Sequence, residues 1–264
     1  MYDRIIKRFF DLLLGIVALP FLGIAVLVIA PLVKHEDKGP AFYNSPRVGR
    51  HGKSFTMYKF RTMFVDAPDF KMPDGSAYNA PDDPRMTRIG TKLRKTSMDE
   101  LPQVLNIIRG EMSFIGPRPD LEEEAALYVG DESRKLEVRP GISGYAQVYG
   151  RNAITWRERL ALDVEYVERI GFLLDVRIFL RTFAVVFSGQ GVYVAHAEAA
   201  ETVGTTAAEQ FEAPALMPAE PAAEPAGDPA TVSATVLTAI PAVLPSAALT
   251  DDPANASNTS GPLP

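Results

Sequence analysis

Residues 12–33 read LLLGIVALPFLGIAVLVIAPLV, a stretch of about 22 residues without a charged side chain. A straight helix rises ~1.5 Å per residue, so this stretch is just long enough to cross a bilayer core of ~30 Å. Its apolar residues occupy every side of such a helix, which argues against a helix buried in a soluble protein. We therefore expect a membrane-associated protein whose fold is organised around this segment.

Basic residues flank the apolar stretch on both sides. They are Arg4, Lys7, Arg8, Lys34, Lys38, Arg47 and Arg50. Because cytoplasmic segments retain an excess of Lys and Arg, both ends are expected on the cytoplasmic side. Pro20 lies near the middle, where it removes a backbone hydrogen bond and can kink a helix. We therefore favour a re-entrant membrane hairpin over residues 1–36. A single membrane span is the alternative, and the stretch is long for a cleaved signal peptide.

The chain has 264 residues and a net charge of -6, but its charge is unevenly distributed. No Lys or Arg follows Arg181, whereas nine Asp and Glu residues do. The first 181 residues therefore hold all 27 bases and 24 of the 33 acids, a basic excess of three. This balance suits anionic substrates or a membrane surface, but it is too small to indicate nucleic-acid binding. Cys is absent, which excludes disulfides and thiolate chemistry.

Composition and patterning divide the chain into three parts and predict an α+β fold, mainly helical with short strands. A folded domain over residues 37–192 follows the hairpin. Residues 193–264, rich in Ala, Pro, Glu and Thr, predict a disordered acidic tail. The amphipathic segment 172–187 is expected to lie on the membrane or to pack under the core. Within the folded domain, we expect a strand over 54–61 and helices over 87–95, 160–170 and 172–187.

The segment Ser97-Met98-Asp99-Glu100-Leu101-Pro102-Gln103 places two adjacent carboxylates at a predicted helix start, with basic segments on both sides. One carboxylate of such a pair can attack phosphorus, while the other binds a metal or moves a proton. A purely structural reading also exists for Glu100. Ser97 followed three residues later by Glu matches the capping-box pattern, in which both side chains bond to backbone N–H groups.

Two further segments supply cations for binding phosphate. Lys59 and Arg61 would point to the same face of the predicted strand. In Pro117-Arg118-Pro119, two prolines fix a turn around one guanidinium, which suits bidentate recognition of a phosphate.

Taken together, these segments resemble the bacterial sugar transferase family, the monotopic polyprenyl-phosphate phosphoglycosyl transferases. The resemblance covers roughly residues 1–190. It is to the small type of member, which is without the additional N-terminal membrane helices of longer members. The motifs that carry it, after the Pro-containing hairpin, are Lys59-Phe60-Arg61-Thr62-Met63, Arg88-Ile89-Gly90, Leu93-Arg94-Lys95-Thr96-Ser97, Asp99-Glu100-Leu101-Pro102-Gln103, Met112-Ser113, Gly116-Pro117-Arg118-Pro119, Arg139-Pro140-Gly141 and Gly150-Arg151-Asn152.

The resemblance implies transfer of a sugar-1-phosphate from a UDP-sugar to undecaprenyl phosphate, with release of UMP. It implies that Asp99 is the nucleophile of a covalent phosphosugar intermediate and that Glu100 assists with Mg²⁺ and with protons. It places the chain at the bacterial inner membrane, with the catalytic domain on the cytoplasmic face. The expected substrate- and phosphate-binding residues are Lys59, Arg61, Arg94, Arg118, Arg139, Gln147 and Arg151.

The implied reaction begins the membrane stage of exopolysaccharide, capsule, O-antigen or glycoconjugate synthesis, and downstream glycosyltransferases are possible partners. Two other functions fit parts of the sequence. A glycosyltransferase would move only the sugar and release UDP. A non-catalytic membrane adaptor would explain the charge distribution and the tail, but gives no reason for a rigid Pro-Arg-Pro unit beside Asp-Glu. The sequence does not identify the sugar.

Overall fold

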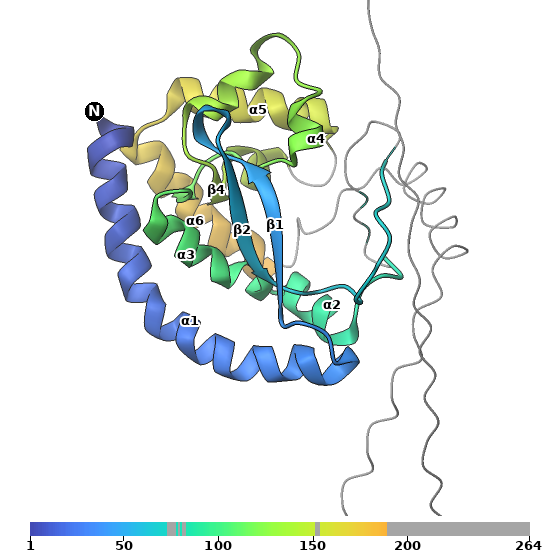
Figure 1. Ribbon diagram of the computed structural model, residues 1–264. Coiled ribbons are helices and arrows are strands. Elements are labelled where there is room, and N and C mark those ends of the chain that lie inside the picture. The colour runs from blue at the N-terminus through green and yellow to red at the C-terminus, as the bar shows by residue number, and fades with distance from the viewer. Residues whose placement is uncertain (73–77, 79, 81–82, 151–153, 189–264) are drawn as a thin grey trace, which may run out of the picture. The chain divides into compact units, whose positions relative to one another are not determined.

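The computed structural model describes residues 1–188 except 73–77, 79, 81–82 and 151–153 (Figure 1). These residues belong to one compact unit, Met1–Pro218. The predicted acidic tail and Arg151 lie outside the described residues.

The described part of the chain is mainly helical with short strands, as the sequence predicted. The α-helices are α1 (Lys7–Asp37), α2 (Arg88–Lys95), α3 (Val104–Arg109), α4 (Glu122–Ala125), α5 (Trp156–Arg169) and α6 (Phe172–Ser188). Shorter turns of other helix types are η1 (Tyr2–Ile6), η2 (Arg50–Gly52), η3 (Met98–Gln103), η4 (Gly130–Glu137) and η5 (Ala146–Gly150). The strands are β1 (Phe42–Val48), β2 (Ser54–Phe60), β3 (Ser113–Ile115) and β4 (Gly141–Ser143).

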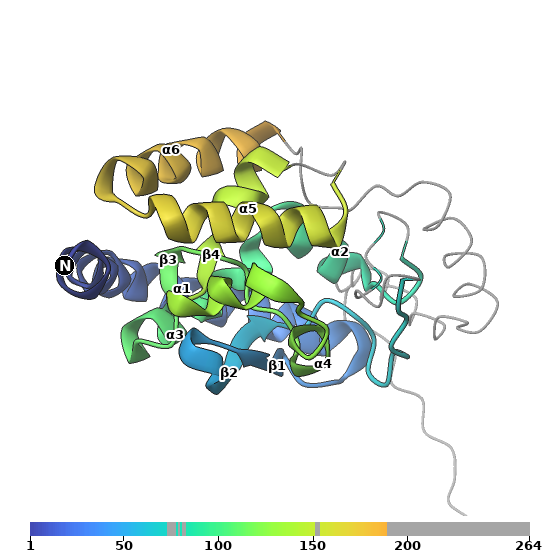
Figure 2. The ribbon, with the colours of Figure 1, turned by 90° about the horizontal axis from the view of Figure 1, so that it is seen from above.

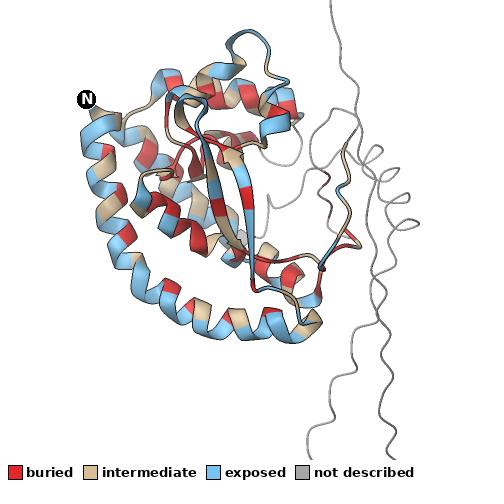
Figure 3. Cartoon of the chain, viewed as in Figure 1, coloured by how far each residue is buried: buried red, intermediate tan, exposed pale blue. Residues whose placement is uncertain are grey.

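Helix α1 is one continuous helix with Pro20 and Pro31 inside it, and Figure 1 shows that it curves along its length. The apolar segment is therefore a bent helix, and not two helices joined by a turn. Together with η1 it forms a helix, Tyr2–Asp37, that is long and apolar enough to cross a membrane. Much of its surface is exposed, as the pale blue face in Figure 3 shows. Exposure of so many apolar side chains is typical of a surface that contacts lipid or protein.

The C-terminal half of α1 packs on the rest of the protein through one face. Ala25, Ile29 and Val33 are buried there against Phe60 of β2 and Leu93 of α2. The Glu36 carboxylate accepts hydrogen bonds from the first N–H groups of α2, Arg88 N at 2.7 Å and Ile89 N at 3.0 Å. Such a cap satisfies donors that have no partner within their own helix. The end of α1 therefore fixes the start of α2.

The strands form two small sheets. β1 and β2 make an antiparallel hairpin in which Tyr43 pairs with Lys59 and Arg47 with Phe55. β3 and β4 pair in parallel. Figure 2 shows α5 and α6 on one side of β3 and β4, with the β1–β2 hairpin on the other side. The largest buried cluster lies between β3, α5 and α6 and includes Ile115, Tyr166 and Ile178.

Candidate active site

The segment that contains Asp99 and Glu100 does not begin in the way the sequence predicted. Ser97 has a φ of 56°, in the left-handed region, and its side chain makes no capping hydrogen bond. The predicted capping box with Glu100 is therefore wrong. Residues Met98–Gln103 form the tight helix η3, which continues into α3. Pro102 lies inside η3, two residues before α3 begins.

Asp99 is a buried carboxylate, 5% exposed, in the middle of a group of cations. Burial and the neighbouring Glu100 carboxylate raise the pKa of Asp99, whereas the charges of Lys59, Arg94 and Arg118 act in the opposite direction. Desolvation disfavours the charged form of a carboxyl group, and nearby cations favour it. Three of the predicted phosphate-binding residues are thus within electrostatic reach of the predicted nucleophile.

Glu100 is held by the Pro-Arg-Pro loop. Arg118 Nη1 donates to Glu100 Oε1 at 2.9 Å. The loop can approach this position because Gly116 precedes it, and a Cβ at Gly116 would lie only 2.4 Å from the carbonyl oxygen of Arg139. The two residues that were singled out from separate motifs therefore form an ion pair.

Two further cations reach the site from β2 and α2. Lys59 lies at the end of β2 with its Nζ 5.3 Å from the centroid of the Tyr43 ring. Burial and the charge of Arg94 lower the pKa of Lys59 to about 8. Arg94 donates from Nη2 to Thr62 Oγ1 at 3.4 Å. Both cations flank Asp99 because β2 and α2 pack beside η3.

Arg61 has a different place from the one predicted. β2 ends at Phe60, so Arg61 does not share a strand face with Lys59. Its buried guanidinium forms an ion pair with Asp37 at the end of α1 and donates to Pro40 O at 2.5 Å and Met63 O at 3.0 Å. All of these bonds hold the junction that follows α1. The structure therefore gives Arg61 a supporting position in the fold.

Arg139 is also separate from the carboxylate pair. Its Nε donates to Gly110 O at 3.2 Å, and its Nη1 donates to Asp3 O at 3.5 Å. Gly110 follows α3, whereas Asp99 lies at the start of the helical segment that leads into α3. Arg139 thus joins the N-terminus to the far end of this segment.

Gln147 lies near the base of the Pro-Arg-Pro loop. Its Nε2 donates to Ile142 O at 2.9 Å, and among the described residues its buried Oε1 has no hydrogen-bond partner. A Cβ at Gly144 would lie 3.1 Å from this oxygen and 2.2 Å from the Gly116 carbonyl oxygen. Gln147 is therefore held close to the loop.

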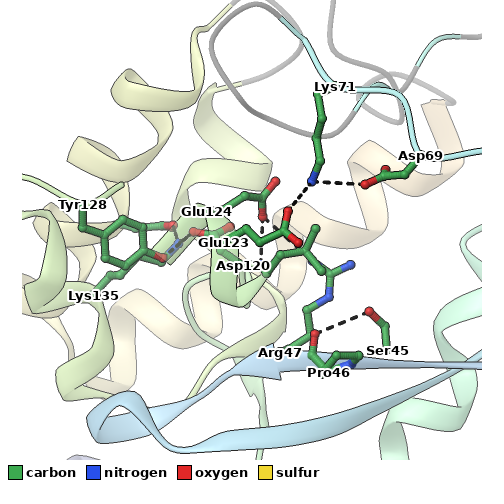
Figure 4. A network of polar contacts seen from close by, with 12 residues as sticks. Ser45, Pro46, Arg47, Asp69, Lys71, Asp120, Glu123, Glu124, Tyr128 and Lys135 are labelled. Carbon is green, nitrogen blue, oxygen red and sulfur yellow. Dashed lines mark hydrogen bonds and ion pairs between the residues drawn. The ribbon is translucent and has the colours of Figure 1, made fainter. Parts of the chain in front are cut away.

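Arg47 is a cation near the site that the sequence motifs did not single out. Its Nη1 lies 4.0 Å from Glu124 Oε2, and its buried Nε has no hydrogen-bond partner in the described part of the chain (Figure 4). Burial and the charge of Arg118 lower the pKa of Arg47. Only the register of the β1–β2 hairpin brings Arg47 to this place, and no local sequence signal reports that register.

Asp120, the residue after the Pro-Arg-Pro unit, was also missed. Its Oδ2 accepts from Tyr128 OH at 2.6 Å and from Lys135 Nζ at 2.7 Å (Figure 4). The buried Lys135 Nζ lies 2.9 Å from Asp163 Oδ2 on α5. We call Asp120, Tyr128, Lys135 and Asp163 the Lys135 cluster. Its members lie up to 43 positions apart in the sequence, and they form no compact motif.

The donor set at the carboxylate pair suits Mg²⁺ if substrate phosphates complete the coordination. Mg²⁺ is commonly bound by one or two carboxylates together with phosphate oxygens and waters. Asp99 and Glu100 supply two carboxylates. Within the described ranges, no group of three or more His, Asp or Glu side chains could hold a metal without a substrate.

Comparisons with known proteins point to one family. The family model described as "Bacterial sugar transferase" matches residues 2–189. "Uncharacterized sugar transferase EpsL" of Bacillus subtilis is 41% identical over 188 residues, which cover 71% of this chain and 90% of that protein. "Exopolysaccharide production protein ExoY" of Sinorhizobium fredii is 42% identical over 198 residues, covering 71% and 88%. "Undecaprenyl-phosphate galactose phosphotransferase" of Salmonella typhimurium is 35% identical over 208 residues, covering 72% of this chain and 42% of that protein.

Proposed function

The chain belongs to the bacterial sugar transferase family, and we propose that it transfers a sugar-1-phosphate from a UDP-sugar to undecaprenyl phosphate with release of UMP. The relative from Salmonella typhimurium bears the name of such a phosphotransferase. The observation that carries the proposal is the buried Asp99 carboxylate among Lys59, Arg94 and Arg118. A diphosphate substrate is anionic, so a carboxylate can approach it only where cations offset the repulsion.

We assign the attack on phosphorus to Asp99. An oxygen of its carboxylate bonds to the phosphorus that carries the sugar, and the bond from this phosphorus to the UMP oxygen breaks. UMP leaves with the bonding electrons, and an aspartyl phosphosugar remains. An oxygen of undecaprenyl phosphate then attacks the same phosphorus and releases the carboxylate. Dividing one displacement into two in this way is the usual advantage of a covalent intermediate.

Glu100 and the cations support this attack. Arg118 neutralises Glu100 in the structure and can turn its remaining donors toward a phosphate. Lys59 and Arg94 offset the charge of the diphosphate beside Asp99. Glu100 would hold Mg²⁺, which when bound supplies further neutralisation of the phosphate oxygens.

The acceptor is a lipid, so the site must lie at headgroup level. Exposed apolar side chains on α1, such as Phe21 at 69% and Leu27 at 77%, and on α6, such as Leu173 at 79%, provide a surface for the membrane. We propose that the curved α1 enters the cytoplasmic leaflet of the inner membrane and returns to the same side. The basic residues at both of its ends support this topology.

The test is a UMP-release assay on the full chain in detergent or nanodiscs with undecaprenyl phosphate and a panel of UDP-sugars. We expect UMP with at least one sugar and a phosphosugar adduct on the protein by mass spectrometry. Asp99→Asn should lower turnover by about a thousandfold or more and abolish the adduct, because an amide is a poor nucleophile. The exposed Asp131→Asn serves as the matched control. Release of UDP, or full turnover by Asp99→Asn, would overturn the proposal.

A further inference from the structure

We propose that the Lys135 cluster is a positioning device for Arg118, and that Lys135 and Asp120 act on the reaction through that arginine. This inference rests on the proposed function, because Arg118 matters only if it serves the Asp99–Glu100 site. The residues of the cluster touch neither Asp99 nor Glu100 in the structure, so their contribution is to place the guanidinium.

Two prolines largely fix the backbone of the loop that carries Arg118. Pro117 and Pro119 are both buried, whereas the Arg118 side chain between them is 39% exposed. Each proline fixes its own φ, and the loop backbone is thereby largely predetermined. The guanidinium nevertheless stands at the end of a long side chain, and its position depends on where the loop is attached. Asp120, directly after Pro119, provides an attachment on the C-terminal side.

Three hydrogen bonds hold Asp120 in place. Its side chain accepts from Tyr128 OH at 2.6 Å and from Lys135 Nζ at 2.7 Å. Its backbone oxygen accepts from Val48 N of β1 at 3.0 Å. The charge of Lys135 and these bonds lower the pKa of Asp120 despite its burial, so the carboxylate is ionised at neutral pH. The loop is therefore fastened to β1 and to η4 at the same residue.

Burial of the charges of Lys135 and Asp163 costs free energy and therefore needs a reason. The side chains of Lys135 and Asp163 are 3% and 2% exposed, and two carboxylates share one ammonium. Apolar residues of similar volume often stabilise a fold as well as a buried ion pair does, because desolvation of the charges is costly. The hydrogen bond from Lys135 Nζ to Asp120 Oδ2 is, however, directional and fixes the two groups it joins. Placement of Arg118 against Glu100 at 2.9 Å gives this costly arrangement a purpose.

A double-mutant cycle tests whether Asp120 acts through Arg118. We expect Asp120→Asn to lower kcat by about tenfold to a hundredfold, because small displacements of a reacting group have effects of this size. In an Arg118→Ala background, the same change should alter kcat by less than about twofold, since the group to be positioned is gone. Tyr128→Phe, which removes one bond to Asp120 and keeps the ring, is the milder substitute if Asp120→Asn fails to fold.

Asp175→Asn is the matched control, because Asp175 is a buried carboxylate bonded to one Lys and to tyrosine hydroxyls elsewhere in the protein. Its effect on kcat should be the same in both backgrounds. If Asp120→Asn also has equal effects in the two backgrounds, the positioning role is overturned.

If the wild-type chain releases no UMP, the proposed function fails and a second measurement decides the inference. Phenylglyoxal labelling of Arg118, read by peptide mass spectrometry, should then become severalfold faster in Asp120→Asn than in the wild type. An unchanged rate would overturn the positioning role without reference to activity.

Discussion

Two carboxylates in this protein, the buried Asp175 and the half-buried Asp120, have similar surroundings but join different parts of the chain. Asp175 Oδ2 accepts from Lys7 Nζ at 2.5 Å and from Tyr2 OH at 2.6 Å, and its Oδ1 accepts from Tyr166 OH at 2.7 Å. Asp175 is on α6 and Lys7 is on α1, so this Asp175 cluster attaches the apolar N-terminal helix to the C-terminal end of the described fold.

The Lys135 cluster also contains a carboxylate, a Lys and a Tyr, but its members lie closer together in the sequence. Asp120 also accepts from one Lys and one Tyr, but Lys135 is only 15 residues away and is shared with Asp163. The two clusters contain the same chemical groups, but they differ in the parts of the chain that they connect. The Asp175 cluster joins distant helices, and its loss should affect the attachment of α1. The Lys135 cluster stiffens a loop, and its loss should affect the reaction.

Removing the ammonium from each cluster gives the largest expected effect. Lys135→Met should lower the free energy of unfolding by ~3–5 kcal/mol, because it leaves two buried carboxylates without a cation. Lys7→Met should cost less, because it leaves one carboxylate that two tyrosine hydroxyls still solvate. Chemical unfolding in detergent micelles measures both. Lys71→Met, at a more exposed ion pair, should cost at most ~1 kcal/mol. Equal costs for all three variants would contradict the comparison.

Asp120 should make the stability of the folded protein depend on pH in the acid range. Its pKa is lowered in the folded protein, chiefly by Lys135, against the cost of burial. Its contribution to stability is therefore fully present above the unfolded value of ~3.9 and is lost as the pH falls through the folded value. Asp120→Asn should flatten this acid limb by about 1.4 kcal/mol per unit of pKa lowering. Unfolding curves between pH 5 and 2 test this, and an unchanged slope in the variant would count against it.

The smallest effect comes from the tyrosine hydroxyls. Tyr166→Phe and Tyr128→Phe each remove one hydrogen bond to a buried carboxylate, so both should cost ~1–2 kcal/mol of stability. Their kinetic effects should differ. Tyr128→Phe should lower kcat several-fold, while Tyr166→Phe should leave kcat unchanged at temperatures where both variants are folded. UMP-release rates beside melting curves make this measurement. Identical kcat values for the two variants would contradict the proposed difference in function between the Lys135 cluster and the Asp175 cluster.

Local features of the fold were predictable from the sequence. Residues 54–60 form a strand, and residues 88–95 and 172–188 form helices, close to the expected bounds. Thr87 caps α2 by accepting from Gly90 N at 2.9 Å, a bond between neighbours in sequence.

The site was predictable where motifs converge and not where partners are distant. Asp99, Glu100, Lys59, Arg94 and Arg118 do lie together. The same sequence reasoning assigned a phosphate-binding role to Arg61, which the fold uses at Asp37. That ion pair forms because the end of α1 lies beside Arg61. The sequence around Arg61 does not indicate that a segment 24 positions earlier will lie there. The capping box failed for a related reason, since its pattern is correct but Ser97 lies in the left-handed region.

The bond between Lys7 and Asp175 joins residues 168 positions apart, and this has a consequence for the order of events on the ribosome. At ~5–20 residues per second, roughly ten to thirty seconds separate the synthesis of the two partners. The apolar N-terminal helix is therefore made well before its carboxylate partner on α6 exists. Its attachment to α6 is among the last contacts that the described part of the chain can form.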